Sequence, residues 1–322
     1  METIIEVKNL IKRYKKSDKN AVDDISFDVH KGEFFAFLGP NGAGKTTAIS
    51  ILTAMLNLTS GKVSVAGFDV TKDSHKVRQE IGVIFQEQSL DKNLTAEENI
   101  RFHASLYGLF PFRPFYSLMS EDYKERVNEL AKLVGIENDL FKTIKTYSGG
   151  MRRKLEIIRS LMHKPKILFL DEPTTGLDPL SRKNVWEYIL KVRKEDETTI
   201  FLTTHYLEEA AYADRICIMN NGKIVSIGTP NPIRKELIDS FLEVNSLDTR
   251  KLGFELIDHN FNFSGSGPFQ IELNNESRSL QEIIHLIKTP LSDLKVHEPT
   301  LEEAYIEIIN KTSLNKNEEA LP

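Results

Sequence analysis

The spacing of hydrophobic and polar positions changes at a glycine-rich stretch near residue 40. Before it, the apolar segments IIEVKNL, ISFDV and FFAFL have the length and pattern of strands. After GPNGAGKTT, the segment TAISILTAMLNL has the pattern of a helix, which we expect to end at Leu58. Because the period changes across the glycines, the sequence predicts a strand, a loop and a helix in succession.

Later segments extend this pattern of strands and helices. TSGKVSVAGFDV predicts a hairpin and IGVIF a short strand; from Thr95 to about Leu161 the pattern is helical, and Thr95 with Glu98 forms a capping box. KILFLDEP and TTIFLTTH are apolar runs between helix-like stretches, as in buried strands of a largely parallel sheet. RICIMNNGKIVSIG predicts a hairpin that turns at Asn221 and Gly222.

The character of the chain changes beyond Pro230. We expect a short helix over PIRKELID, the alternating segments FELI and FQIEL as strands, a helix over LQEIIHLI, and a last helix in which Thr300 and Glu303 form a capping box. These elements predict a small α+β domain. We therefore divide the chain into an α/β unit (1–229) with a helical part at about 95–161, an accessory or regulatory domain (230–312) and a disordered tail (313–322).

The glycine-rich stretch carries the first candidate chemistry. Gly39 to Thr46, GPNGAGKT, fits G-x-x-x-x-G-K-[ST] between a strand and a helix, the context that distinguishes a phosphate-binding loop from an ordinary glycine-rich turn. Its backbone N–H groups can surround phosphates and Lys45 can supply charge to the outer ones. Thr46 is the expected ligand of Mg²⁺.

Two later strand ends carry further candidates. Asp171 closes the apolar run ILFL, so its carboxylate can emerge at the edge of the sheet where ligands gather, and we expect it to hold the Mg²⁺ shell. Glu172 follows and suits a base for the attacking water. His205 ends the strand IFLTT, where a residue sensing the γ-phosphate would lie. The alternatives are a solvated strand end and a structural histidine.

A second potential anion site begins at Ser148, Gly149 and Gly150. These residues lead into an amphipathic helix with Leu155, Ile158 and Leu161 on one face. A helix start offers free N–H groups and about half a positive charge. The chain therefore contains two phosphate sites about a hundred residues apart in sequence, although one nucleotide needs only the first loop.

Composition narrows the function classes. The net charge of -5 and the pI near 6.0 argue against a surface built to neutralise nucleic-acid phosphates. The single cysteine, Cys217, excludes an intrachain disulfide and lies in the apolar run RICIM, which favours a buried structural thiol over a reactive one. The opening METIIEVKNL lacks the apolar core of a signal peptide, and no apolar run approaches the roughly 18 to 20 residues of a spanning helix.

The order and spacing of these motifs resemble the ATP-binding cassette family over roughly Thr3 to Gly228. The resemblance is nearest to stand-alone ATPase subunits of the daunorubicin-resistance, drug-export type, because the signature is YSGGM where LSGGQ is commoner and because the chain carries EPTLEEAYIEII near its end. It implies a P-loop NTPase cassette: a RecA-like, mostly parallel sheet with an antiparallel β subdomain and a helical signature subdomain. The motifs that carry it are Tyr14, GPNGAGKTT, Gln86, YSGGM, ILFLDEP, GLD and His205.

The resemblance also implies roles for single residues. Tyr14 would stack on the adenine of ATP, Gln86 would reach Mg²⁺ and the attacking water, and Asp178 would link one active site with the other. His205 would hold the γ-phosphate and water in line. The residues expected around the phosphates are Gly39, Asn41, Gly42, Gly44, Lys45, Thr46 and Thr47.

The same resemblance accounts for the second helix start. In the family two cassettes pair head to tail, and each signature covers the ATP of the other. We therefore expect an ATPase subunit with Mg²⁺, a second cassette that is either identical or related, and membrane-spanning permease subunits on separate chains, with this chain on the cytoplasmic face of the membrane. The alternatives are a soluble cassette ATPase acting on ribosomes or DNA and an ATP clamp without turnover, which would lack Glu172 or His205.

The aromatic insert YGLFPFRPFYSLM, from Tyr107 to Met119, permits two interpretations. Its rings can pack the helical subdomain, or they can form an exposed docking patch for the membrane partner. Replacing Phe112 and Phe115 with Ser distinguishes the two interpretations. A docking patch predicts loss of membrane association with folding and ATP binding retained, and packing predicts loss of folding.

Overall fold

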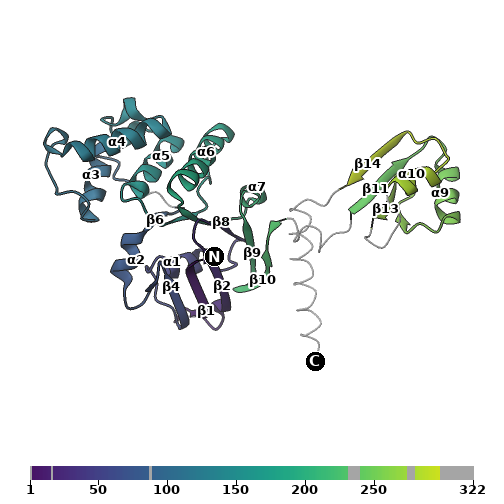
Figure 1. Cartoon of the computed structure of the whole chain (residues 1–322), viewed down its shortest axis with the longest axis horizontal. Helices are drawn as coiled ribbons and strands as arrows, with labels where there is room; N and C mark the ends of the chain where they lie inside the picture. Colours follow the sequence, from purple (N-terminus) through teal and green to yellow (C-terminus); the bar gives the residue numbers. More distant parts are fainter. Residues whose placement is uncertain (1, 16, 87–88, 231–239, 274–279, 298–322) are drawn as a thin grey trace. The chain divides into compact units, whose positions relative to one another are not determined.

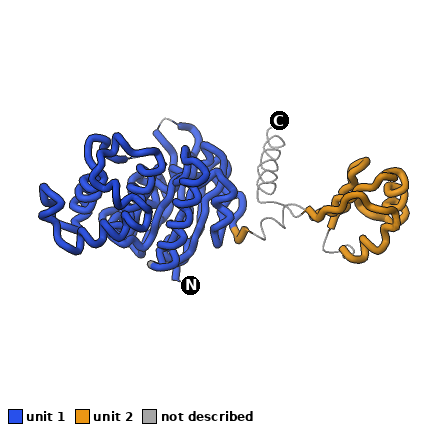
Figure 2. Tube along the Cα trace, turned by 90° about the horizontal axis from the view of Figure 1, so that it is seen from above, with its two compact units in different colours: residues 1–227 blue, residues 228–322 orange. Residues whose placement is uncertain are grey.

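The computed structural model describes residues 2–15, 17–86, 89–230, 240–273 and 280–297, drawn in colour in Figure 1. The helix expected over PIRKELID, the last helix expected from Thr300 onward and the tail 313–322 lie outside these ranges. The chain forms two compact units, residues 1–227 and 228–322 (Figure 2).

Two sheets form the framework of the first unit. The antiparallel sheet has the order β2-β1-β4-β5, and the larger sheet has the order β10-β9-β3-β8-β7-β6 with parallel pairing among β9, β3, β8, β7 and β6. The bounds are β1 (Thr3–Arg13), β2 (Asn20–His30), β3 (Phe34–Leu38), β4 (Ser60–Val65), β5 (Phe68–Asp69), β6 (Ile81–Ile84), β7 (Ile167–Asp171), β8 (Thr199–Thr204), β9 (Arg215–Asn220) and β10 (Lys223–Gly228).

Helices surround these sheets, and α3, α4 and α5 gather at one end of the unit, away from β1, β2 and β4 (Figure 1). None of the helices in the described part of the chain is long and apolar enough to cross a bilayer. The bounds are α1 (Lys45–Leu52), α2 (Ser74–Glu80), α3 (Ala96–Leu106), η1 (Tyr116–Leu118), α4 (Glu121–Val134), η2 (Glu137–Asp139), η3 (Ile144–Thr146), α5 (Gly149–Leu161), α6 (Pro179–Asp196) and α7 (Leu207–Ala210).

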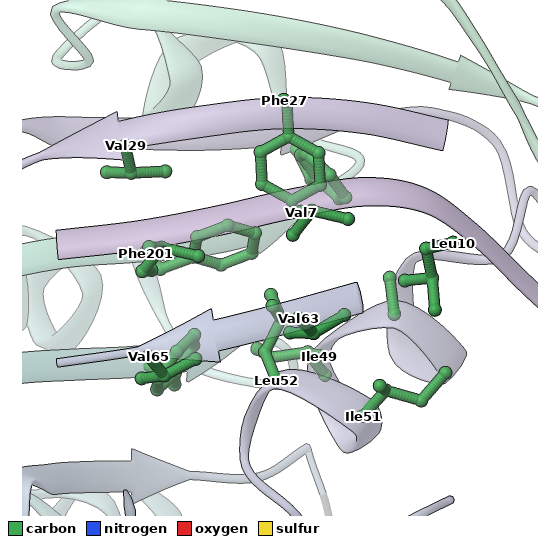
Figure 3. Close-up of a cluster of buried hydrophobic side chains, with 14 of the residues drawn as sticks. Val7, Leu10, Phe27, Val29, Ile49, Ile51, Leu52, Val63, Val65 and Phe201 are labelled. Carbon is green, nitrogen blue, oxygen red and sulfur yellow. The ribbon is translucent and has the colours of Figure 1, made fainter. Parts of the chain in front are cut away.

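The core of the first unit lies where α1 and the two sheets meet, as Figure 3 shows. Phe27 of β2 lies with its ring centroid 4.9 Å from that of Phe37 and 6.2 Å from that of Phe201. Burying such aromatic side chains contributes the largest share of core stability per residue. The core therefore fixes β3 and β8, whose carboxyl ends carry the glycine-rich loop and His205.

The strand predictions for this unit agree with the structure. The α/β fold class is confirmed, and the hairpin turns at Asn221 and Gly222 with φ of 49° and 81°, as a tight hairpin turn requires. The helix expected to reach Leu58 is shorter and ends at Leu52. Ala54 adopts a left-handed φ of 54°, and Thr53 Oγ1 donates to the Ile49 carbonyl at 2.9 Å, so the last turn closes early.

The helical part begins as the sequence predicts. Thr95 Oγ1 accepts from the Glu98 N–H at 3.2 Å, and Glu98 accepts from the Thr95 N–H at 2.8 Å, which confirms the capping box. Cys217 is fully buried and burial raises its pKa, consistent with a structural thiol. In the aromatic insert, Phe110 packs edge-on against the buried Tyr123, whereas Phe112 and Phe115 are 50% and 66% exposed.

A stack of three rings joins α3 to the end of α5. The centroid of Tyr107 lies 4.4 Å from that of His103 and 5.0 Å from that of His163. Burial, with the charges of Arg159 and His163, lowers the pKa of His103 to about 3. His103 is therefore neutral in the folded protein across the pH range in which it titrates in an unfolded chain.

This neutral histidine gives a prediction for pH dependence. The unfolded chain binds a proton at His103 below pH 6.5 and the folded protein does not, so stability falls as pH falls from 6.5 toward 3. We expect His103→Phe to remove up to about 1.4 kcal/mol per pH unit of this dependence, the value for one proton. Urea titrations at pH 7 and 5, followed by the single tryptophan Trp186 in the first unit, measure it. Equal pH slopes in variant and parent would contradict a neutral His103.

The second unit has its own sheet and core. Within residues 240–273 and 280–297, four antiparallel strands in the order β12-β13-β11-β14 and two helices follow one another as β-α-β-β-α-β, the connectivity of ferredoxin-like domains. Leu242, Leu252 and Ile271 lie in its core. The bounds are β11 (Ser240–Asn245), α9 (Thr249–Asp258), β12 (Phe263–Ser264), β13 (Phe269–Leu273), α10 (Leu280–Leu286) and β14 (Asp293–His297).

One strand prediction in this unit is wrong. FELI, residues 254–257, belongs to α9 and not to a strand, whereas FQIEL forms β13 as expected. The Asp248 side chain accepts from the Lys251 N–H at 3.1 Å and caps this helix, and Leu252 and Leu256 lie four residues apart in the core. The short alternating pattern of FELI is thus one turn of an amphipathic helix.

Candidate nucleotide site

The glycine-rich loop joins β3 to α1 and turns closely against neighbouring backbone. Gly44 has a φ of 105°, and a Cβ atom on it would lie 2.4 Å from the carbonyl oxygen of Ala21. Only glycine meets both conditions. The loop therefore brings its backbone N–H groups and the start of α1 to one point, the arrangement that binds phosphates.

A cavity of about 480 Å³ lies over this loop. It brings together residues from the loop, from the segment after β6 and from the ends of β7 and β8. Its lining residues are Ala21, Asn41, Gly42, Ala43, Gly44, Lys45, Thr46, Thr47, Gln86, Glu172, Thr175, His205 and Tyr206.

Lys45 is 5% exposed, and its ammonium group bonds to the loop itself. Nζ donates to the carbonyl oxygens of Gly39 at 2.6 Å and Pro40 at 3.1 Å. Burial lowers the pKa of Lys45, while the nearby carboxylates Glu172 and Asp171 act in the opposite direction. The loop thus holds a cation at the cavity wall, where its charge can bind an anionic ligand.

Asp171 lies at the end of β7 beside the start of α1. It is 2% exposed, accepts from the Thr203 hydroxyl and interacts with Thr46, and burial raises its pKa. A buried carboxylate beside a threonine hydroxyl provides the hard oxygen ligands that Mg²⁺ prefers. The donor set of Asp171 and Thr46 therefore fits a magnesium ion.

Glu172 contacts the two remaining candidate residues, Gln86 and His205. Its Oε1 lies 3.0 Å from His205 Nδ1, and its Oε2 accepts from Gln86 Nε2 at 3.2 Å and from Thr175 Oγ1 at 3.3 Å. The residue has a left-handed φ of 47°, an uncommon conformation for a non-glycine residue that often marks functional positions. Glu172, His205 and Gln86, far apart in sequence, thus form one hydrogen-bonded group.

Comparison with known proteins identifies the family. The family described as ABC transporter matches residues 22–175. The uncharacterized ABC transporter ATP-binding protein YhcH of Bacillus subtilis (strain 168) is 30% identical over 318 residues, 97% of this chain and 98% of that protein. This chain belongs to the family of ABC transporter ATP-binding proteins. The family resemblance predicted from the motifs is confirmed.

Other relatives of this ABC protein are named for drug resistance or for multidrug transport. The daunorubicin/doxorubicin resistance ATP-binding protein DrrA of Streptomyces peucetius is 39% identical over 247 residues, 76% of this chain and 71% of that protein. The probable multidrug ABC transporter ATP-binding protein YbhF of Escherichia coli (strain K12) is 38% identical over 235 residues, and the match spans 73% of this chain but only 39% of YbhF.

A solved cassette shares the fold of the first unit. The ATP-binding cassette MJ0796, solved as a dimer in a post-hydrolysis state with ADP and Pi, matches with a TM-score of 0.62 and 26% identity over 70% of this chain and 98% of that chain. The predicted P-loop cassette fold of this ABC protein is therefore confirmed.

The signature segment of the ABC cassette lies apart from the cavity lining. Ser148 is the N-cap of α5, where its side chain accepts from the Met151 N–H at 3.2 Å, and neither it nor Gly149 nor Gly150 is among the described residues that line the cavity. Asp178 caps α6 by accepting from the Ser181 N–H at 2.9 Å.

Tyr14 lies just beyond β1, close to the start of α1. Its hydroxyl is 3.4 Å from Thr47 Oγ1, and the residue is 46% exposed. Tyr14 is thus next to the glycine-rich loop of the ABC cassette with a ring that solvent reaches, as a residue that stacks on a base requires.

The sequence predictions omit several residues of the site. Ala21, Thr175 and Tyr206 line the cavity, and Thr175 donates to Glu172. Thr175 could have been found in the run DEPTT, three residues after the carboxylate. Ala21 carries no chemical signal, because it lies at the cavity through the close approach of its backbone to Gly44.

Proposed function

We propose that this chain is the ATP-binding and ATP-hydrolysing subunit of an ABC exporter. The observation that carries the proposal is the carboxylate of Glu172, held between Gln86 and His205 in the cavity over the glycine-rich loop. ATP binds with its phosphates on the loop and against Lys45, and its adenine against Tyr14. The phosphate contacts come from Gly39, Asn41, Gly42, Gly44, Thr46 and Thr47.

The residues around Glu172 have different roles in ATP hydrolysis. Glu172 accepts a proton from the attacking water. His205 orients that carboxylate through Nδ1, 3.0 Å away, and the rest of its ring would hold the γ-phosphate and the water in line. Mg²⁺ would be held by Thr46, Asp171 and Gln86, and it neutralises phosphate charge when bound. Asp171 takes part as an oxygen ligand fixed by Thr203, not as the base.

A second cassette completes the site. Ser148, Gly149 and Gly150 begin α5 with free N–H groups and are not part of the described cavity lining in their own chain, so they suit the ATP of another copy. Two chains, identical or related, then pair head to tail, and Asp178 links the two sites. ATP closes the pair because two helix starts gain anionic partners, and hydrolysis opens it.

Separate membrane-spanning permease subunits carry the transported molecule in this proposal, and the chain lies peripherally on the cytoplasmic face of the membrane. The resistance name of DrrA and the multidrug-transporter name of YbhF favour export. Both Glu172 and His205 are present, which favours turnover over an ATP clamp. Acidic net charge disfavours the soluble alternative that acts on ribosomes or DNA.

The proposal is tested by purifying tagged chain from its own host in Mg-ATP and identifying its companions by mass spectrometry. A multi-spanning protein in near-equal amount is expected. The exposed Phe112 and Phe115 are candidate contacts, since large exposed apolar side chains tend to mark interfaces. We expect the Phe112→Ser, Phe115→Ser double variant to keep its ATP affinity but no longer to purify with the multi-spanning protein.

The matched control for the double variant is Leu247→Ser in the second unit, a side chain that is 97% exposed and that should leave the companion bound. Unfolding of the Phe double variant would instead assign the insert to packing. Ribosomal proteins or DNA-bound factors as companions would contradict the exporter.

A further inference from the structure

Three charged residues recur at every third position on the signature helix α5: Arg153, Glu156 and Arg159. Arg153 and Glu156 are each 4% exposed, although charged side chains are rarely buried to this degree without dedicated partners. The partners of this row lie on the two segments that carry Gln86 and Glu172.

Arg153 binds the backbone of both segments. Its Nε donates to the Pro173 carbonyl at 2.5 Å, and its Nη2 donates to the Glu172 carbonyl at 3.3 Å. Its Nη1 donates to the Phe85 carbonyl at 2.6 Å, and Phe85 directly precedes Gln86. The planar guanidinium of Arg153 thus fixes the main chain next to Gln86 and at Glu172, whose side chains meet in the cavity.

The next two turns of α5 bind the far side of the Gln86 segment. Glu156 Oε1 accepts from the Ser89 N–H at 3.1 Å, and Arg159 Nη1 donates to the Ser89 carbonyl at 2.9 Å. Glu156 Oε2 also accepts from Arg153 Nη1 at 2.9 Å. Both flanks of Gln86 are therefore tied to the same face of one helix.

A buried ion pair alone does not explain this arrangement. Glu156 could neutralise Arg153 with one or two hydrogen bonds. The guanidinium nevertheless donates three further hydrogen bonds to carbonyl groups of two separate segments. Lysine could supply the charge but not this planar fork. The arrangement has the geometry of a clamp that sets the relative position of two backbones.

We propose that Arg153 is a positioning residue that holds Glu172 and Gln86 of its own chain in register with the start of the signature helix. The inference rests on the proposed function, because it assumes that Glu172 is the base and that Ser148 faces the ATP of a second copy. Arg153 lies five residues after Ser148 on the same rigid helix. When the start of α5 moves as it contacts the ATP of the second copy, Arg153 moves with it and displaces the carbonyl groups of Phe85, Glu172 and Pro173. The Arg153 side chain thereby couples the two ATP sites.

Hydrogen–deuterium exchange tests the clamp without requiring any turnover. In the full-length, nucleotide-free Arg153→Lys variant, peptides over 81–90 and 167–177 should exchange about ten-fold faster than in the parent, because local opening becomes less costly. The matched control is Arg126→Lys on α4, whose Nη2 donates to the Leu161 carbonyl at 2.9 Å and which lies outside the site. Unchanged exchange in both peptides would overturn the proposal.

Kinetics separate positioning from a general structural role. Arg153→Lys should lower kcat by about 10²-fold, the effect of a misplaced reacting group, while the Kd for ATP stays within about two-fold, since Lys45 and the loop are intact. Arg126→Lys should change neither. A weaker Kd with unchanged kcat would overturn the proposal. If the parent chain itself fails to hydrolyse Mg-ATP, the proposed function fails, and the exchange experiment still decides the clamp.

A second variant covers the case in which Arg153→Lys does not fold. Glu156→Gln removes the ion pair and leaves the three carbonyl contacts of Arg153 in place, so kcat should fall by less than about three-fold. A fall near 10²-fold would assign the effect to the ion pair and contradict a clamp made of carbonyl contacts.

Discussion

Replacing Glu172 by Gln should lower ATP turnover by about 10² to 10⁴-fold, as expected when a positioned base is removed. Glutamine keeps the shape of the side chain, so the contacts to Gln86 and Thr175 can persist while the proton acceptor is lost. ATP affinity should be unchanged, because the phosphate loop and Lys45 are not altered. Steady-state phosphate release and equilibrium ATP binding measure the two quantities.

The same variant should accumulate as a dimer in Mg-ATP, since the step that opens the pair no longer occurs. The matched control is Glu208→Gln, three residues beyond His205 and exposed on α7, which should turn over like the parent. Turnover in Glu172→Gln at the parent rate would remove Glu172 from its role as the base and leave the carboxylate a structural partner of His205.

Ser148→Arg should abolish closure of the pair while each chain still binds ATP. The side chain of Ser148 caps α5 at the Met151 N–H, and arginine removes this cap and fills the helix start with a large side chain. Loss of an N-cap costs about 1 kcal/mol, which the buried face of α5 can tolerate. We therefore expect a folded chain, turnover reduced by at least about 10²-fold, and no dimer in ATP.

Light scattering with and without Mg-ATP measures this prediction. Ser120→Arg is a matched control, because Ser120 caps α4 in the same way by accepting from the Tyr123 N–H at 3.4 Å, away from the nucleotide cavity. A control that also fails to dimerise would show that cap loss, and not the signature position, disrupts the pair.

The sequence predicted most of the elements that carry the site, for a physical reason. ILFL and IFLTT are continuous apolar runs, so both are buried strands, and the carboxyl ends of parallel strands meet at one edge. This rule alone brought Asp171, Glu172 and His205 together. Their mutual contacts, such as the 3.0 Å between His205 and Glu172, depend on side-chain conformations that the rule does not specify.

Other features depend on tertiary contacts that periodicity does not report. The helix after the glycine-rich loop ends at Leu52 because Ala54 takes a left-handed conformation, and the following TAMLNL still carries apolar residues at helical spacing. FELI alternates like a strand but is too short to exclude a helix. In the sequence, Arg153 is one of two adjacent arginines. Its burial and its hydrogen-bond partners, which distinguish it from Arg152, are visible only in the structure.

We propose that the signature of one chain completes the ATP site of another, and mixed pairs of chains reveal whether it does. Pairs with distinct tags carry Lys45→Ala and Ser148→Arg either on opposite chains or on the same chain, with Glu172→Gln in both chains to prevent turnover. In a head-to-tail pair, opposite placement leaves one complete site and should trap one ATP per pair, whereas placement on one chain damages both sites and should trap none. Trapping of ATP only in the second arrangement would mean that each signature serves its own chain, and would rule out a head-to-tail pair.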